Sequence, residues 1–182
     1  MAGEGAEKFA LEQKSEKEVQ SPKSKAQSPK SRVEVGTLDI GLSTFDYNQF
    51  GAVALDRSGN LAAGTSTGGV TAKNYGGVGA AAIIGAGTYA NNNSCAVSAI
   101  GRDDYLIRLG VARDISAIME YQAATIQDAA DRVIRQKLQK PGGSGGVIAI
   151  DKFGNMAISF NTEGMYRAYI NADGKPVVEI YK

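Results

Sequence analysis

Short apolar runs and Gly-rich turns alternate along the chain from residue 51 onward, and this pattern predicts β-strands. Runs at 51–56 and 61–67 flank the turn sequence RSGN and predict a hairpin. Two further runs, at 81–87 and 94–100, predict buried strands. The first part of this region is therefore expected to be all β.

The spacing of apolar residues then changes to that of a helix. Between residues 103 and 121 they recur every three or four positions, which predicts an amphipathic helix weakened at Gly110. Thr125 with Asp128 resembles a capping box and predicts the start of a second helix, which Pro141 ends. Two helices are expected to pack on the sheets.

Strand-like runs return at 145–151, 156–161 and 177–181. Strands followed by two helices and more strands indicate an α+β class. With 182 residues and 43% apolar content, the chain is long enough to bury a core in one domain.

The first 35 residues differ from the rest, because Lys, Glu, Ser and Gln dominate and the sequence SPKS occurs twice. So little apolar surface cannot offset the entropy cost of ordering, which predicts a flexible tail over 1–35. An irregular insert is expected over 36–50 and a folded domain over 51–182. The basic stretch 22–32 indicates either a phosphorylation or anion-contact site or a solvated linker.

Composition narrows the classes of function. Twenty basic and nineteen acidic residues give no net field to attract nucleic acid or an anionic membrane. Cys95 is the single cysteine and histidine is absent, which removes intramolecular disulfides, the commonest general base and the commonest transition-metal ligand. No signal peptide or membrane span is recognisable, so a cytoplasmic protein is expected.

No metal or organic cofactor is predicted. The glycines at 142–146 follow a helix rather than a strand, so they do not form a dinucleotide-binding fingerprint and are interpreted as tight turns.

Four segments, taken together and in this order, resemble one known family. They are GTSTGG (64–69), IGAGTYANN (84–92), GGSGGVIAID (142–151) and FNTEGMYRA (160–168). From residue 51 to 182 the chain resembles the β-subunit of plant-type L-asparaginases, the isoaspartyl peptidases. The resemblance implies an Ntn-hydrolase αββα sandwich, of which this chain would be the β-subunit half only.

In that family a precursor cuts itself before a threonine, which then attacks L-asparagine or a β-aspartyl dipeptide. The new α-amine serves as base, and such a base makes histidine unnecessary. The resemblance also implies a truncated chain that needs a complementary α-subunit-like chain or self-association to complete its sheets.

The position of the nucleophile is the first departure from the family pattern GTVGAV. Its ungapped counterpart is Gln49, which carries no nucleophilic oxygen. Thr37, in the sequence Gly-Thr-Leu at 36–38, resembles the family's GTV and is the candidate nucleophile, with Thr44 a weaker one. The insert 39–50 would have to loop out, although it spans up to ~40 Å when extended. The alternative is that both threonines are ordinary loop residues.

At the other site positions this sequence matches the family pattern at some residues and departs from it at others. Thr67 matches the family's second threonine, which hydrogen-bonds around the nucleophile's amine, although a structural role at a strand end is the alternative. Gly77 and Ala80 replace the arginine and the aspartate that hold the substrate's carboxylate and amine. Loss of such charged contacts removes about 1.5–3 kcal/mol per hydrogen bond.

Gly101 keeps the backbone that the family uses for the oxyanion and the substrate amine. Ile100 replaces the neighbouring hydroxyl donor, a loss of roughly 3–4 kcal/mol in measured cases. Arg102 is interpreted either as a displaced cation or as a solvated helix-start residue.

Three hypotheses follow. In the first, the chain is a catalytically degenerate pseudoenzyme. In the second, it is an active amidohydrolase that uses Thr37 after autocleavage, as a threonine protease does. In the third, it is a non-enzymatic interaction module that acts through its SPKS tail. The sequence favours the first, since four substitutions fall at one site while the scaffold glycines remain.

Overall fold

A computed structural model describes residues 49–68, 76–170 and 174–181. All of these except 76–78 belong to one compact unit, built from 34–70 and 79–182. The tail predicted over 1–35, most of the insert predicted over 36–50, and both Thr37 and Thr44 lie outside the described residues.

The predicted hairpin is confirmed. Strand β1 (Gln49–Leu55) pairs antiparallel with β2 (Leu61–Thr67), and β1 begins two residues before the predicted start. The turn is closed by Asp56, whose carboxylate accepts hydrogen bonds from the backbone of Ser58 and Asn60 at 2.8 Å each. Hydrogen bonds from the side chain and backbone of Asn60 hold the pKa of Asp56 below its usual value.

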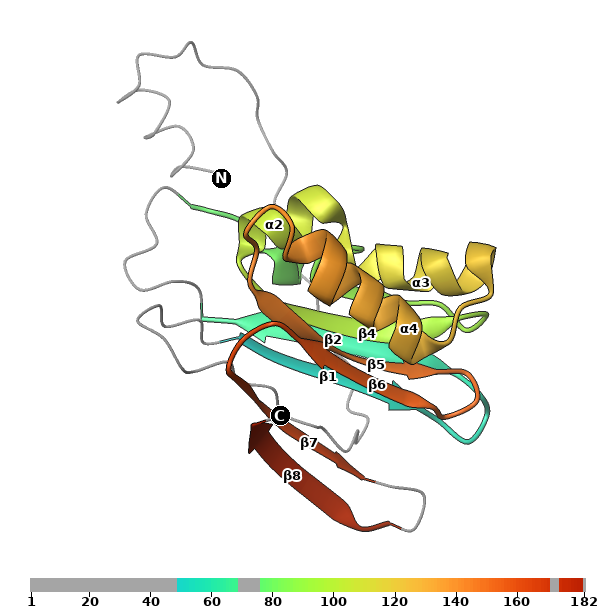
Figure 1. Cartoon of the computed structure of the whole chain (residues 1–182). Coiled ribbons are helices and arrows are strands. Elements are labelled where there is room, and N and C mark those ends of the chain that lie inside the picture. The colour runs from blue at the N-terminus through green and yellow to red at the C-terminus, as the bar shows by residue number, and fades with distance from the viewer. Residues whose placement is uncertain (1–48, 69–75, 171–173, 182) are drawn as a thin grey trace, which may run out of the picture. The chain divides into compact units, whose positions relative to one another are not determined.

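The main sheet has the strand order β3-β4-β5-β6 and is antiparallel throughout (Figure 1). Its predicted strands are confirmed as β4 (Cys95–Gly101), β5 (Gly145–Asp151) and β6 (Met156–Phe160). The short strand β3 (Thr88–Ala90) was not predicted.

The buried strand predicted at 81–87 is wrong. This segment begins with a short 3₁₀ helix, η1 (Ala80–Ala82), and Ile84 is 82% exposed. The chain bends back on itself here, because Gly85 takes a left-handed φ of 90° and the N–H of Gly87 donates to the Ala80 carbonyl. Its apolar residues therefore lie in turns, and the segment's strand pairing is limited to one isolated bridge between Ile84 and Thr88.

The first predicted helix is two helices that meet at Gly110. Helix α2 (Asp103–Leu109) ends and α3 (Val111–Gln122) begins at this glycine, whose φ of 58° lies in the left-handed region. A left-handed residue breaks the helical hydrogen-bond ladder at little cost only when it is glycine. The weakness predicted at Gly110 is therefore a complete break.

The second predicted helix is confirmed, together with its cap. Helix α4 (Ile126–Asp131) starts after Thr125, whose hydroxyl accepts the Asp128 N–H at 3.1 Å. The helix continues as a π-helical segment, η2 (Arg132–Leu138).

The helices cover one face of the main sheet and the β1–β2 hairpin covers the other (Figure 1). Under the helices lies an apolar core of fully buried side chains. It includes Val97, Leu106, Ile115, Ile134 and Val147. A smaller cluster on the hairpin side contains Ile100, Ile148, Phe160 and Met165.

Strands β7 (Gly164–Ile170) and β8 (Pro176–Tyr181) form a separate two-stranded antiparallel sheet. Strand β8 was predicted and β7 was not. Mixed helix and sheet confirm the α+β class.

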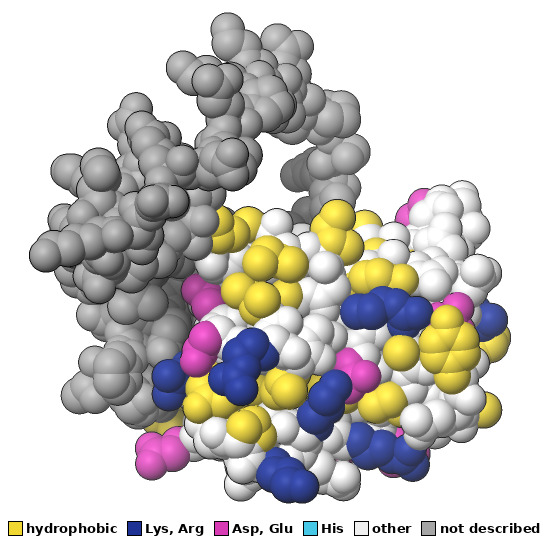
Figure 2. Space-filling view, turned by 90° about the horizontal axis from the view of Figure 1, so that it is seen from above, with side chains coloured by type: hydrophobic (Ala, Val, Ile, Leu, Met, Phe, Trp, Pro, Cys, Tyr) yellow, Lys and Arg dark blue, Asp and Glu magenta, His cyan; other side chains and the backbone are white. Residues whose placement is uncertain are grey.

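Seen from the helix side, basic and acidic side chains are interspersed with apolar ones (Figure 2). Some of them form ion pairs between or along helices, such as Lys137 with Asp114 and Arg135 with Asp131, both at 2.8 Å. Mixed charge of this kind produces no strong local field on this face. Within the residues that the structure describes, no helix is both long and apolar enough to span a membrane.

Candidate functional site

The β1–β2 hairpin lies very close to β4, and small residues make this possible. A Cβ at Gly51 would collide with the Ser98 hydroxyl. Thr65 lies on β2, opposite Gly51. Its hydroxyl lies 2.7 Å from the Ser98 hydroxyl and donates to the Gly87 carbonyl at 2.8 Å. Hydrogen bonds therefore join the two sheets at this point.

The same face of the hairpin carries the position expected for the nucleophile. Gln49 lies directly opposite Thr67 in the β1–β2 register, so the two side chains project from the same face. Gln49 is only 4% exposed. The structure thus brings together Thr67, predicted as a site residue, and Gln49, the residue found in place of the nucleophile.

The Gln49 carboxamide reaches the end of β4 and binds the backbone of Gly101 through both of its polar atoms. Its Oε1 accepts the Gly101 N–H at 2.7 Å, and its Nε2 donates to the Gly101 carbonyl at 3.2 Å. Gly101 has a φ of 148°, and a Cβ there would collide with the Ser144 carbonyl. A side chain at this position would therefore strain the backbone and collide with its neighbour, and only glycine avoids both.

Asp103 completes this group and was not predicted from sequence. Its Oδ1 accepts the Ala80 N–H at 2.8 Å and lies 3.4 Å from Gln49 Nε2. The absence of a side chain at Gly79 makes room for the carboxylate, because a Cβ there would lie 2.8 Å from Asp103 Oδ2. The sequence shows only that Asp103 lies in the first turn of a predicted helix. Acids are common there because they stabilise the helix, so this position alone does not indicate a functional site.

The two residues on either side of Gly101 differ in burial. Ile100 is fully buried among apolar side chains, so its side chain belongs to the core and offers no donor. Arg102 is about half exposed, forms a 3.6 Å ion pair with Asp104 and lies over the Tyr105 ring. These contacts are those of a helix-start surface residue, one of the two interpretations of Arg102. Gly77 lies outside the compact unit that carries the other site residues.

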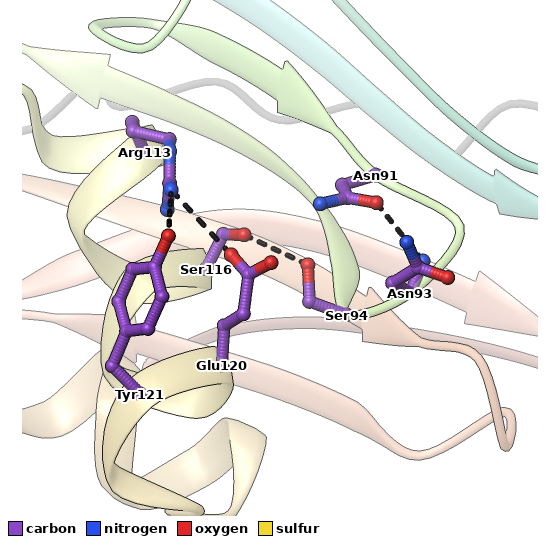
Figure 3. A network of polar contacts seen from close by, with 7 residues as sticks. All are labelled: Asn91, Asn93, Ser94, Arg113, Ser116, Glu120 and Tyr121. Atoms are coloured by element: carbon purple, nitrogen blue, oxygen red, sulfur yellow. Dashed lines mark hydrogen bonds and ion pairs between the residues drawn. The ribbon is translucent and has the colours of Figure 1, made fainter.

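A second polar group lies where α3 passes the β3–β4 turn (Figure 3). Arg113 contacts Glu120 at 3.4 Å and the Tyr121 hydroxyl at 3.5 Å, while Ser94 and Ser116 share a buried hydrogen bond of 2.7 Å. Each serine hydroxyl is bonded to the other hydroxyl and not to a base, so this arrangement contains no activated nucleophile.

A cavity of about 620 Å³ opens beside this second polar group. Met119, Ile126, Phe153 and Met156 supply much of its apolar lining. Two acids line it, Asp151 and Glu120. Asp151 accepts hydrogen bonds from Phe153 and Asn155, and Glu120 lies 3.4 Å from Arg113, so both carboxylates already have partners within the protein.

Among the residues that the structure describes, a thiol and clusters of metal-ligating side chains are the other reactive groups to consider. Burial raises the pKa of the Cys95 thiol to about 11, so it is protonated and unreactive at neutral pH. Among the described residues, no cluster of three or more His, Cys, Asp or Glu side chains could hold a metal ion.

Comparison with known proteins gives a consistent result. A family model described as Asparaginase matches residues 1–180. The chain is 47% identical to an isoaspartyl peptidase of Escherichia coli, over all of this chain and 60% of that protein. It is 53% identical to a putative isoaspartyl peptidase/L-asparaginase of Dictyostelium discoideum, over 68% of this chain and 35% of that protein. The chain therefore spans about 60% or less of the length of these relatives.

Proposed function

Because this chain belongs to the isoaspartyl peptidase and L-asparaginase family, we propose that it is a catalytically silent member that keeps the family's Ntn-hydrolase scaffold. In this proposal it is a β-subunit-like half of the αββα sandwich, and it no longer hydrolyses L-asparagine or β-aspartyl dipeptides.

The contact between Gln49 and Gly101 carries this proposal. Gln49 occupies the position that the resemblance assigns to the nucleophilic threonine, and a carboxamide cannot form an acyl intermediate. Its Oε1 accepts the Gly101 N–H at 2.7 Å, and the resemblance assigns this backbone to the oxyanion. The group that should bind the developing charge is therefore already used by the protein itself.

The remaining substitutions point the same way. The hydroxyl donor at the oxyanion is replaced by the buried Ile100 side chain, and loss of one such donor costs roughly 3–4 kcal/mol of transition-state stabilisation. Ala80 replaces the aspartate that holds the substrate's amine in the family, and it is buried, with 1% of its surface exposed. Without the nucleophile, the hydroxyl donor and the carboxylate, the site keeps little of the family's expected rate enhancement.

The proposal includes a partner that completes the sheets, either an α-subunit-like chain or a second copy. Two of the three sheets among the described residues have only two strands, and such sheets are marginal alone. Exposed apolar side chains on β8 support this, since Val178 is 76% exposed and Tyr181 is 62% exposed. Light scattering at several concentrations should detect self-association, whereas a strictly monomeric chain that binds no α-subunit-like half would contradict the partner.

The test of catalytic silence uses the purified full chain. After prolonged incubation at neutral pH, intact mass should show one uncut species, and no ammonia should be released from L-asparagine. A fragment that begins at Thr37, together with turnover, would contradict the proposal and support the alternative of an active amidohydrolase.

A Thr37→Ala variant shows whether any observed cleavage and turnover depend on Thr37. If the native chain does release ammonia, the variant should abolish both cleavage and turnover when Thr37 is the nucleophile. Turnover that survives in the variant would indicate a contaminating enzyme. The third hypothesis, binding through the SPKS tail, would lose its support if deletion of residues 1–35 changed no binding partner.

A further inference from the structure

The end of β4 has a pair of backbone groups that the sheet itself does not use. The Ala99 N–H donates to the Gly87 carbonyl at 2.8 Å, on the side of β4 that faces β3. Backbone groups of alternate residues point to the same side, so those of Gly101 also face that side. Within the described chain β3 pairs only with 96–98, so it does not reach Gly101.

The Gln49 side chain takes the place of the missing strand. A primary carboxamide carries an acceptor and a donor side by side, as a peptide group does. Its oxygen accepts the Gly101 N–H at 2.7 Å and its nitrogen donates to the Gly101 carbonyl at 3.2 Å. Both hydrogen-bonding groups of Gly101 on this side are satisfied by one side chain.

The carboxylate of Asp103 adds selectivity for a group with two N–H donors. Its Oδ1 lies 3.4 Å from Gln49 Nε2 and accepts the Ala80 N–H at 2.8 Å, which fixes its position. A carboxylic acid has one O–H donor and a tertiary amide has none, so neither can donate to both the Gly101 carbonyl and this carboxylate, and an anion would be repelled. The three partners therefore match a primary carboxamide.

We propose that Gly101 and Asp103 form a binding site for a primary carboxamide, and that this chain fills the site with its own Gln49 side chain. The inference rests on the proposed function, because a site filled by Gln49 cannot also turn over a substrate.

The internal occupant excludes external ligands. A tethered side chain has an effective concentration of mM or more, so a weakly binding free carboxamide does not displace it. Gln49 is also 4% exposed, which leaves no opening for a second ligand beside it. Free carboxamides are therefore expected to bind only when the Gln49 side chain is removed.

Propionamide is the probe, because it has the same atoms as the side chain that a Gln49→Gly substitution removes. At 100 mM it should raise the Tm of the Gln49→Gly full chain by about 2–4 °C and leave the native chain unchanged. If the variant is unfolded, propionamide should restore its folded spectrum. Neither a Tm shift nor refolding would overturn the proposal.

Matched controls separate this site from general solvent effects. Propionate and N,N-dimethylpropionamide, which lack the N–H donors, should have at least fivefold weaker effects than propionamide. In a Gln49→Gly, Asp103→Ala double variant the propionamide effect should also fall at least fivefold. Equal effects of all three compounds, or no dependence on Asp103, would overturn the carboxamide assignment.

The native chain offers a second measurement that needs no substitution. The Gln49 side-chain N–H protons should exchange with solvent at least tenfold more slowly than those of the exposed Gln136, and equal exchange would contradict the internal contact. Ammonia release by the native chain would contradict catalytic silence alone. Failure of the propionamide experiment would contradict this inference and leave catalytic silence standing.

Discussion

The two faces of the main sheet are held in different ways. On the helix side, fully buried apolar residues from three helical segments pack on the strands, among them Leu106, Ile115 and Ile134. On the hairpin side, the contact near Gly51 depends on a missing side chain and on hydroxyl groups 2.7 Å apart. The first face is held by a large apolar core, whereas the second combines a smaller apolar cluster with polar contacts that depend on a few atoms.

This difference separates scaffold from site. An apolar face tolerates similar substitutions because volume and pattern matter more than any single atom. The hairpin face places the Gln49 carboxamide on Gly101 with hydrogen bonds of 2.7 and 3.2 Å, and such a contact has no equivalent substitute. Function is therefore expected to change through the hairpin face while the helix face preserves the fold.

The largest expected effect is on the helix face. Ile115→Ala should lower the free energy of unfolding by about 2–5 kcal/mol, because the side chain is fully buried and leaves a cavity. Urea denaturation measures this loss. The same substitution at Ile84, which is 82% exposed, is the control and should change stability by less than about 0.5 kcal/mol. Equal losses would contradict the packing described for α3.

A smaller effect is expected on the hairpin face. Gly51→Ala should cost about 1–3 kcal/mol, since its Cβ would collide with the Ser98 hydroxyl and force the two sheets apart. Gly64→Ala, on the paired strand, is the control, because its Cβ would meet no atom within 4 Å.

A double variant sharpens this test. Adding Ser98→Gly to Gly51→Ala removes the colliding atoms and should recover part of the loss, although the hydrogen bond between Ser98 and Thr65 is then also lost. If Gly51→Ala costs no more than Gly64→Ala in urea denaturation, the close approach of the hairpin to β4 is wrong.

The smallest effect concerns a polar contact within the helix face. The Ser159 hydroxyl donates to Asp131 at 2.6 Å, and Arg135 lies 2.8 Å from the same carboxylate. Burial works to raise the pKa of Asp131, but hydrogen bonds from Gln127 and Ser159 and the charge of Arg135 hold it below its usual value.

A lowered folded-state pKa stabilises the protein above the unfolded pKa, and this contribution is lost as the pH falls through the folded value. Ser159→Ala should therefore cost a few tenths of a kcal/mol more at pH 6 than at pH 2.5, since the carboxylate is partly exposed. Urea denaturation at both pH values measures the difference. Ser66→Ala, at an exposed position, should show no such dependence, and an identical loss at both pH values would contradict the contact.

Periodicity predicted most of the fold because the helix face is apolar and continuous. The strands at 94–100 and 145–151 and the capped helix after Thr125 follow directly from patterns of this kind. The segment 81–87 has the same composition as a strand but closes a turn, which depends on the left-handed φ of Gly85 and on a backbone contact of Gly87.

The candidate site was predicted only in part, because some of its contacts, like those of the turn at 81–87, leave no pattern in the sequence. Thr67, Gly101 and the substitution at Gln49 could be found from the family resemblance, since each occupies an aligned position. Asp103 could not, because its carboxylate reaches Ala80 from a helix that lies 23 positions further along the chain. A contact between distant segments leaves no local pattern, and Thr37 stays a prediction outside the described residues.

The carboxamide of Gln49 also bears on which strand edges of this chain are open to pairing. A strand edge with unpaired N–H and C=O groups is a template on which another polypeptide can add as an extra strand. Gly101 would present such an edge where β3 ends, and the Gln49 side chain closes it with hydrogen bonds of 2.7 and 3.2 Å. One buried side chain thus occupies the N–H and C=O of Gly101 with which another strand would pair.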